Sequence, residues 1–264
     1  MNTPLRGHAL ITGAGRGIGE AIARALAADG WTLSLAGRHL APLQALAAAL
    51  PAPPAGAPAH GAVTLDVSDE ASVQAGFAAA RAGRGPLRAL VNNAGAVDTA
   101  PFHRTDSALW QRMLVVNLTG AFHCCQAALP DLKAAGPAGG ARIVNIASTA
   151  ALKGYAYVSA YTAAKHGLLG LTRALALELA AEGITVNAVC PGYTDTDIVR
   201  EGVQRIVART GRDVAQARAG FEASNPLGRL VQPAEVGALV AWLCGDLAAA
   251  VNGQALAVDG GETQ

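Results

Sequence analysis

Residues 9–28 read ALITGAGRGIGEAIARALAA, and this stretch decides the fold. It begins with a short apolar run at 9–11, continues through a glycine-rich turn, and ends in a segment whose apolar residues recur at helical spacing. A strand, a glycine turn and a helix in this order can bind phosphate, because the first turn of the helix offers free N–H groups and the positive end of its dipole. The alternative is a glycine-rich turn that binds nothing. The residues expected to contact a dinucleotide here are Gly13, Arg16, Gly17, Ile18 and Gly19.

Strand-like and helix-like segments alternate along the rest of the chain. Short apolar runs at 33–36, 63–65, 87–91, 141–147, 184–189 and 254–258 predict further strands, and 40–50, 107–134 and 159–181 predict helices. This alternation predicts a Rossmann-like α/β fold, a doubly wound parallel sheet of about seven strands with helices on both faces. We find no repeat and no second core, so residues 1–264 are expected to form a single domain. We expect 51–60 to be a surface loop and 136–140 to be a loop insertion.

The composition suits one continuous core and excludes several classes of partner. Of 264 residues, 52% are hydrophobic and 15% are charged. Lys and Arg number 20 against 19 Asp and Glu, so no basic excess indicates a nucleic-acid or membrane partner. Four cysteines lack metal-ligand spacing and are expected to be buried thiols; no metal site is expected. With no signal-peptide run and no apolar run near the roughly 20 residues of a membrane span, we expect a cytoplasmic protein.

The residues after the second strand indicate which dinucleotide is bound. Sites for NAD usually carry an acid about 20 residues after the glycine turn, bonded to the ribose 2′-hydroxyl. Here the sequence is Ala36-Gly37-Arg38, without an acid. Arg38 and Arg16 can supply fork-shaped donors to a 2′-phosphate, so NADP(H) is expected in preference to NAD(H); the alternative is two solvated arginines. Asp66 and Val67, at the end of the third strand, are expected to contact adenine, unless Asp66 simply leads a helix.

Tyr161 and Lys165 form a candidate proton-transfer pair. A spacing of four places them on one face of the predicted helix. A free phenol has a pKa of about 10, but an ammonium roughly 5 Å away at an effective dielectric of ~20 favours phenolate by about 3 kcal/mol. We therefore expect Lys165 to lower the pKa of Tyr161, which could then donate a proton to a carbonyl oxygen or remove one from an alcohol. Taken alone, such a pair is more often structural.

Other polar residues are expected close to Tyr161 and Lys165, where they could assist proton transfer. Ser148 ends the fifth predicted strand, at the carboxyl edge where ligands bind in such sheets, and Asn93-Ala94-Gly95 follow the fourth strand at the same edge. Ser148 could hold a substrate oxygen beside Tyr161. Asn117 interrupts an apolar helical stretch, which is unfavourable without a purpose. It is either a satisfied core amide or the holder of a water that connects to Lys165.

Together these motifs resemble the short-chain dehydrogenase/reductase family over almost the full length. The matching residues, in the family's order, are Thr12, Gly13, Gly17, Gly19, the 92–95 segment NNAG, Asn117, Ser148, Tyr161, Lys165, Pro191 and Gly192. The resemblance implies that Tyr161 is the general acid/base, that Lys165 also binds the nicotinamide ribose, that Ser148 orients the substrate and that Asn117 anchors a proton-relay water. It implies cofactor contacts from Asn93, Ala94, Gly95, Pro191, Gly192, Thr194 and Thr196, and a homotetramer built on helices near 107–134 and 159–181.

Residues 194–225 are expected to form a lid over the substrate. Their apolar helical face and five arginines fit either a lid that accepts an acyl chain on a phosphate-bearing carrier such as coenzyme A, or an amphipathic helix with a solvated face, which we favour. The stretch 225–236 is similar to ketoreductase and 3-hydroxyacyl dehydrogenase members of the family. We therefore predict reduction of a 3-ketoacyl thioester or oxidation of a 3-hydroxyacyl substrate. The alternatives are a dehydrogenase of a small secondary or cyclic alcohol or ketone, and a non-catalytic NADP(H)-sensing protein, which would carry a damaged catalytic set.

Overall fold

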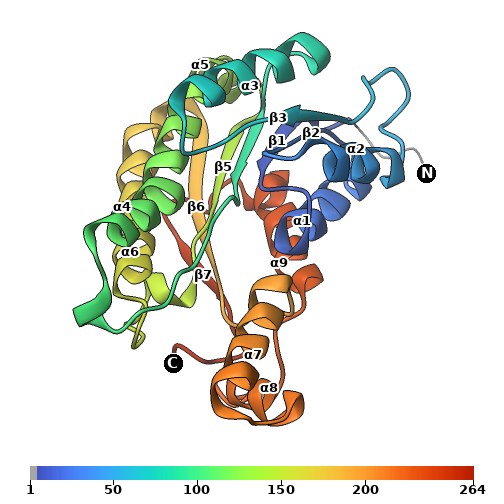
Figure 1. Ribbon diagram of the computed structural model, residues 1–264. Helices are drawn as coiled ribbons and strands as arrows, with labels where there is room; N and C mark the ends of the chain where they lie inside the picture. Colours follow the sequence, from blue (N-terminus) through green and yellow to red (C-terminus); the bar gives the residue numbers. More distant parts are fainter. Residues whose placement is uncertain (1–4) are drawn as a thin grey trace.

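The computed structural model describes residues 5–264, and within them seven strands form one parallel sheet in the order β3-β2-β1-β4-β5-β6-β7 (Figure 1). The strands are β1 (Gly7–Thr12), β2 (Trp31–Gly37), β3 (Gly61–Thr64), β4 (Ala89–Asn92), β5 (Ala141–Ile146), β6 (Ile184–Pro191) and β7 (Ala255–Val258). The chain runs outward from β1 to β3 and then returns to pair β4 with the other side of β1. This reversal places a crevice at the carboxyl ends of β1 and β4, where ligands bind in sheets of this kind.

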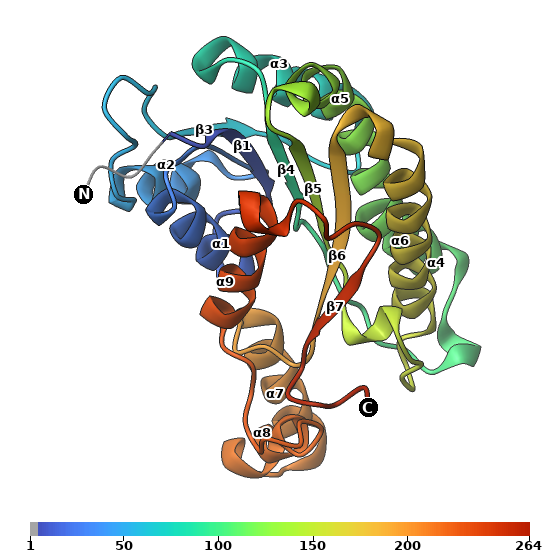
Figure 2. The same cartoon turned by 180° about the vertical axis from the view of Figure 1, so that it is seen from behind.

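Helices cover both faces of the sheet (Figure 2). One face carries α1 (Gly17–Ala28), α2 (Leu40–Ala49) and α9 (Pro233–Cys244), and the other carries α3 (Glu70–Arg84), α4 (Ser107–Leu114), α5 (Gly120–Ala135) and α6 (Ser159–Glu178). Two further helices, α7 (Asp197–Thr210) and α8 (Val214–Glu222), project beyond the carboxyl edge. The predicted fold is therefore confirmed, and 51–60 is a loop as expected.

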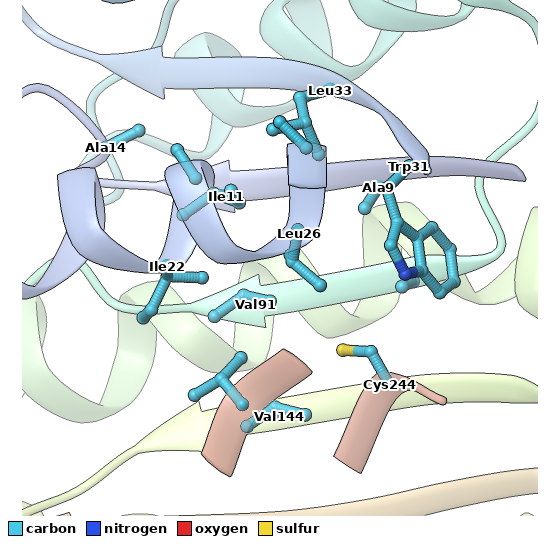
Figure 3. Packing of buried hydrophobic residues seen from close by; sticks show 14 of the residues in the cluster. Ala9, Ile11, Ala14, Ile22, Leu26, Trp31, Leu33, Val91, Val144 and Cys244 are labelled. Atoms are coloured by element: carbon cyan, nitrogen blue, oxygen red, sulfur yellow. The ribbon is translucent and has the colours of Figure 1, made fainter. Parts of the chain in front are cut away.

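The core has one large apolar cluster on each face of the sheet, with a smaller cluster under α5 and α6 and another within α7 and α8. Figure 3 shows the first, in which Ile22 and Leu26 of α1 pack against Ile11, Val91 and Val144 of the strands. These side chains are at most 1% exposed. Because alternate residues of each strand serve opposite faces, strands buried on both sides are mostly apolar, and the polar residues that they bury, such as Asn145, are hydrogen-bonded.

Two helices were not predicted. The α3 segment is rich in Ala and charged residues, and only Val73, Gly76, Phe77 and Ala80 are buried. The α9 segment is apolar on nearly every side and shows little helical periodicity. Both carry start signals that were available in the sequence: Asp69 accepts hydrogen bonds from two N–H groups of the first turn of α3, and Glu235 completes a capping box at the start of α9.

The predicted helix 107–134 is a continuous helical run, Ser107–Ala138, with a π-helical turn at Val115–Thr119 between α4 and α5. Contrary to our expectation, this run is long and apolar enough to cross a membrane by length and composition, with a mean hydropathy of 1.2. It lies against the sheet in the second cluster, however, and its Asp131 pairs with Arg81 of α3 at 2.8 Å. A helix that covers a core passes the same test, and we interpret it as one.

Residues 136–140 are a tight turn where we expected a loop insertion. A Cβ added to Gly136 would lie 1.8 Å from the carbonyl oxygen of Glu182, so the turn packs directly on the segment before β6. Gly140 has a φ of +85°, which favours glycine. This turn lies at the amino edge of β5, at the opposite edge from the crevice.

Candidate active site

A cavity of about 720 Å³ opens at the carboxyl edge of the sheet, a size typical of small-molecule and cofactor sites. Its lining includes every residue singled out from the sequence as catalytic or cofactor-binding: Gly13, Arg16, Gly17, Ile18, Gly19, Arg38, Asp66, Val67, Asn93, Ala94, Gly95, Asn117, Ser148, Tyr161, Lys165, Pro191, Gly192, Thr194 and Thr196. These residues lie at or just after the ends of β1 to β6, in the first turns of α1, in the π-helical turn, in α6 and just before α7. The fold therefore brings together one continuous set.

The glycine turn is fixed by backbone contact with the end of β4. The Asn93 side chain donates to the carbonyl oxygens of Thr12 and Gly13, each at 3.0 Å, and the Thr12 hydroxyl accepts from the Asn93 and Ala94 N–H groups. A Cβ on Gly19 would lie 2.2 Å from the Gly13 oxygen. Glycine is required there because any side chain would push α1 off the turn.

The first turn of α1 meets the requirements of a pyrophosphate site. Arg16 is the N-cap residue, and its side chain makes no capping hydrogen bond. The first N–H groups of a helix have no partner within the helix, so an uncapped end facing a cavity offers them to a ligand. Gly17, which follows, has a φ of +56° and leaves the approach to these donors free of a side chain. A dinucleotide therefore fits the residues present.

At the cofactor end of the cavity, Arg16 and Arg38 differ in how available they are to bind a 2′-phosphate. The Arg16 guanidinium lies 3.4 Å from the Asp197 carboxylate at the start of α7, with 68% of its side chain exposed. Arg38 lowers the pKa of Asp66, although Ser68 is the main cause, since its hydroxyl and N–H both donate to that carboxylate. Arg38 is therefore the more available donor for a 2′-phosphate, and Arg16 would have to leave Asp197 to join it.

Tyr161, Lys165 and Ser148 lie together at the other end. Lys165 lies on α6 one turn after Tyr161, with its Nζ 5.6 Å from the centre of the phenol ring. The Lys165 side chain is buried and donates to the carbonyl oxygen of Ile146 at 2.8 Å. The Ser148 hydroxyl is held by the N–H of Ala150 at 3.0 Å. The helix and the end of β5 thus present an amine, a phenol and a hydroxyl to one region of the cavity.

The pKa of the phenol differs from the expectation. Burial raises the pKa of Tyr161, and contact with the Ser148 hydroxyl offsets this only partly. Burial also lowers the pKa of Lys165 from 10.5 to about 8. The expected lowering of the Tyr161 pKa is therefore not seen in the chain by itself: desolvation raises this pKa, and the partial offset comes from Ser148 and not from Lys165.

Asn117 lies in the π-helical turn and is 1% exposed. Its oxygen accepts from the Ala96 N–H at 3.2 Å, and its nitrogen donates to the carbonyl oxygens of Ala96 at 2.9 Å and Met113 at 3.0 Å. These bonds satisfy the amide and clamp the loop after β4 against α4. The structure thus matches the core-amide interpretation, while the water-relay role implied by the resemblance stays a prediction.

The lid region consists of α7 and α8. Its apolar residues pack on one another and on Tyr193, Phe221 and Leu230, as expected for an amphipathic pair. Arg200 pairs with Asp195 and Asp197, and Arg218 pairs with Asp195 and Glu222. Because these arginines are occupied by carboxylates, the geometry does not favour the phosphate-carrier interpretation of the lid.

Sequence reasoning missed one wall of the cavity. Tyr155 and Tyr193 line it, with their rings 6.4 Å apart in an edge-on arrangement, and Tyr193 packs edge-on against Phe221 of α8 at 5.0 Å. The chain holds only four tyrosines. The positions of these two, six residues before Tyr161 and directly after Pro191-Gly192, were a usable signal.

Known proteins similar to this chain match it over nearly its whole length. Residues 13–263 match the family model described as "Enoyl-(Acyl carrier protein) reductase". A cis-4-hydroxycyclohexanecarboxylate dehydrogenase from Sinomonas cyclohexanicum is 43% identical, over 97% of this chain and 96% of that protein. An acetoacetyl-CoA reductase from Shinella zoogloeoides is 37% identical, over 96% of this chain and 97% of that protein. A solved structure of a variant actinorhodin polyketide ketoreductase with NADPH has a TM-score of 0.89 and 36% identity, and covers 98% of this chain and 97% of that one.

Proposed function

We propose that this chain, which belongs to the short-chain dehydrogenase/reductase family, transfers a hydride between NADP(H) and a 3-ketoacyl or 3-hydroxyacyl thioester. It is a nicotinamide-dependent oxidoreductase that acts on a keto or hydroxyl group. The observation that carries the proposal is the placement of Tyr161, Ser148 and Lys165 in the cavity whose other end holds the uncapped α1 and Arg38.

The chain's own residues supply the proton chemistry. NADPH, when bound, supplies the hydride. Tyr161 Oη donates a proton to the carbonyl oxygen, and Ser148 holds that oxygen by a hydrogen bond. A raised pKa keeps Tyr161 protonated, which is the form that reduction needs. Lys165, whose Nζ lies 5.6 Å from the centre of the phenol ring, stabilises the phenolate that remains; opposite unit charges roughly 5 Å apart at an effective dielectric of ~20 attract by about 3 kcal/mol.

Arg38 supports the preference for NADP(H). It follows β2 at the position where NAD sites carry an acid, and it lines the cavity. Charge-assisted hydrogen bonds are worth about 1.5–3 kcal/mol, so Arg38→Asp should weaken NADPH binding about ten- to hundredfold and leave NADH binding much less affected. Titration of each dinucleotide, followed by fluorescence, measures both constants. Equal losses would refute the 2′-phosphate assignment.

The thioester substrate draws support from two relatives, whose names specify acetoacetyl-CoA and a polyketide ketone. The second candidate substrate is a small cyclic alcohol, and the aromatic wall of Tyr155 and Tyr193 favours it because flat apolar rings pack against such a ring. The relative that acts on cis-4-hydroxycyclohexanecarboxylate points the same way. Rates with β-ketoacyl thioesters and with cyclic ketones, measured in one panel with NADPH, discriminate the two; no turnover of thioesters would overturn our preference.

Tyr161→Phe tests the mechanism. It removes the hydroxyl and keeps the ring, so NADPH should still bind while hydride transfer falls by about 10²–10⁴-fold, the range for loss of a positioned acid. Binding without transfer also separates an enzyme from a dinucleotide-sensing protein. If Tyr161→Phe left transfer intact, the assignment of the proton donor would be wrong.

We also propose that the protein is cytoplasmic and forms a homotetramer. Exposed aromatic side chains on the helical run that the resemblance assigns to an interface support the homotetramer, namely Trp110 on α4, 36% exposed, and Phe122 on α5, 42% exposed. Large apolar side chains at a subunit interface leave water on association. Light scattering on the purified protein gives the mass directly, and Phe122→Glu should reduce it to that of a smaller species.

A further inference from the structure

The segment 259–264, which follows β7, folds against the substrate end of the cavity. The Asp259 carboxylate closes this segment by accepting from the Gly261 N–H at 2.9 Å, the Thr263 N–H at 3.0 Å and the Thr263 hydroxyl at 2.6 Å. Gly260 has a φ of +65° and fits against Asn225 after α8, where a Cβ would lie 1.9 Å from the amide oxygen. The segment therefore has a fixed path next to the lid.

This path buries a carboxylate. The Glu262 side chain is only 2% exposed. Its Oε1 accepts from the Tyr155 hydroxyl and lies 3.6 Å from Lys153 Nζ, which also donates to the Glu262 carbonyl oxygen at 2.8 Å. Its Oε2 has no hydrogen-bond partner among residues 5–264. Burying an acceptor without a partner is unfavourable, so this oxygen needs an explanation.

The unpaired oxygen points at the cavity wall. A Cβ added to Gly192 would lie 2.8 Å from Oε2, and Gly192, Tyr155 and Tyr193 all line the cavity. Glu262 therefore lies one layer behind the wall, next to the region that holds Tyr161 and Ser148. Only the Gly192 backbone and the Tyr155 phenol separate the Glu262 carboxylate from the substrate end of the cavity.

Lys153 neutralises this charge only in part. Its side chain is 41% exposed, with Nζ 5.0 Å from the centre of the Tyr155 ring, whereas Glu262 is buried and Asp259 adds a second carboxylate nearby. Water screens the exposed ammonium more than the buried carboxylate. Glu262 therefore adds negative charge to this part of the wall, while the buried Lys165 ammonium beside Tyr161 adds positive charge to the same end of the cavity.

We propose that Glu262 is a specificity-determining residue: it holds Tyr155 as a wall of the pocket and makes this end select uncharged carbonyl substrates over free keto carboxylates. The inference rests on the proposed function and deepens it. A thioester or a simple ketone brings no charge to this wall, but a free carboxylate would meet the charge of Glu262. At an effective dielectric of ~20, repulsion between two unit charges within roughly 10 Å of each other changes a rate ratio by about tenfold or more.

Ethyl acetoacetate and acetoacetate form the matched substrate pair, since both present a β-keto group and only one is charged. The measured quantity is the ratio of their kcat/KM values with NADPH. We expect the wild type to favour the ester, and Glu262→Gln, which keeps an acceptor for Tyr155, to shift the ratio roughly tenfold toward acetoacetate. Glu178→Gln, an exposed site at the end of α6, is the control for net charge and should leave the ratio unchanged.

Lys153→Met provides a test of opposite sign, which stands even if Glu262→Gln does not fold. It removes the neutralising ammonium, so the ratio should move further toward the ester. A loss of both activities by the same factor in Glu262→Gln, or an unchanged ratio in Lys153→Met, would reduce Glu262 to a structural role and overturn this inference while leaving the proposed function intact. Failure of the wild type to reduce either substrate, or any thioester, would instead overturn the proposed function.

Discussion

The buried ammonium of Lys165 allows a prediction in which stability and activity change in opposite directions. Lys165 is 4% exposed, and burial lowers its pKa from 10.5 to about 8. A pKa lowered by that amount corresponds to a free-energy cost of about 3 kcal/mol for keeping the charged form folded. Replacement by Met removes this cost but leaves the Ile146 carbonyl oxygen without its donor, and that loss destabilises the fold by about 1–2 kcal/mol. Lys165→Met should therefore stabilise the fold by about 1–2 kcal/mol at neutral pH.

The stability that Lys165→Met gains over the wild type should decrease as the pH rises. Between the folded pKa of about 8 and the unfolded value of 10.5, the unfolded chain binds more protons than the folded one. Stability of the wild type therefore rises with pH across this window, and the cost is complete below about pH 8. The advantage of Lys165→Met should be largest at pH 7 and shrink by pH 9.5. Urea unfolding at both pH values measures it.

Activity should move the other way. An ammonium roughly 5 Å from a phenolate oxygen stabilises it by about 3 kcal/mol at an effective dielectric of ~20, so Lys165→Met should lower kcat/KM for ketone reduction about a hundredfold at pH 7. The matched control is Lys133→Met, which removes an exposed ammonium paired with Glu182 and should change stability by less than about 1 kcal/mol. If Lys165→Met proved less stable than Lys133→Met at pH 7, the burial argument for Lys165 would be refuted.

Three further changes test separate parts of the site. Gly19→Ala places a Cβ 2.2 Å from a carbonyl oxygen of the glycine turn, so calorimetry should show dinucleotide binding lost or reduced more than a hundredfold; near-normal affinity would contradict the close packing. Asp197→Asn weakens the 3.4 Å pairing with Arg16 at an exposed site, so unfolding should change by less than about 1 kcal/mol while NADPH affinity rises a few-fold; an unchanged NADPH constant would mean that Arg16 does not reach the phosphate. Thr172→Val leaves the buried Asn145 amide without its 2.8 Å acceptor and should cost about 1–3 kcal/mol by urea unfolding; a neutral result would show that this bond between β5 and α6 contributes little.

The fold was predictable because its signals are local. Strands buried on both faces are mostly apolar, and the glycine turn marks where the first one meets its helix. The α3 and α9 helices were not predicted, for two different reasons. In α3, Ala and charge weaken the apolar pattern, and in α9 the exposed side also carries apolar residues such as Ala238 and Trp242, so few polar residues set a period. Both were recoverable from their capping residues.

The membership of the site was also predictable, but its energetics were not. Each residue of the predicted set lines the cavity, since each follows a strand end or lies one turn from a neighbour in the set. The direction of the pKa change at Tyr161 depends on how much protein covers the phenol, and spacing along a helix does not specify burial. The Arg16–Asp197 pair and the Tyr155–Glu262 contact join residues 181 and 107 positions apart, and no local pattern announces either.

The contacts that the sequence predicts lie mostly in the cofactor half of the cavity, and those that it does not predict lie mostly in the substrate half. The cofactor half consists of turns that the Thr12 and Asn93 side chains fix through hydrogen bonds to neighbouring backbone groups, so a short motif determines it. The walls of the substrate half include Tyr155, Tyr193 and the start of α7, and α8 and the segment 259–264 support these walls from behind through Phe221 and Glu262. Substitutions in those side chains leave the sheet untouched, so relatives that share the fold can differ in substrate. Substrate choice should therefore change with Glu262 and Tyr155, and cofactor choice with Arg38, each without altering the other.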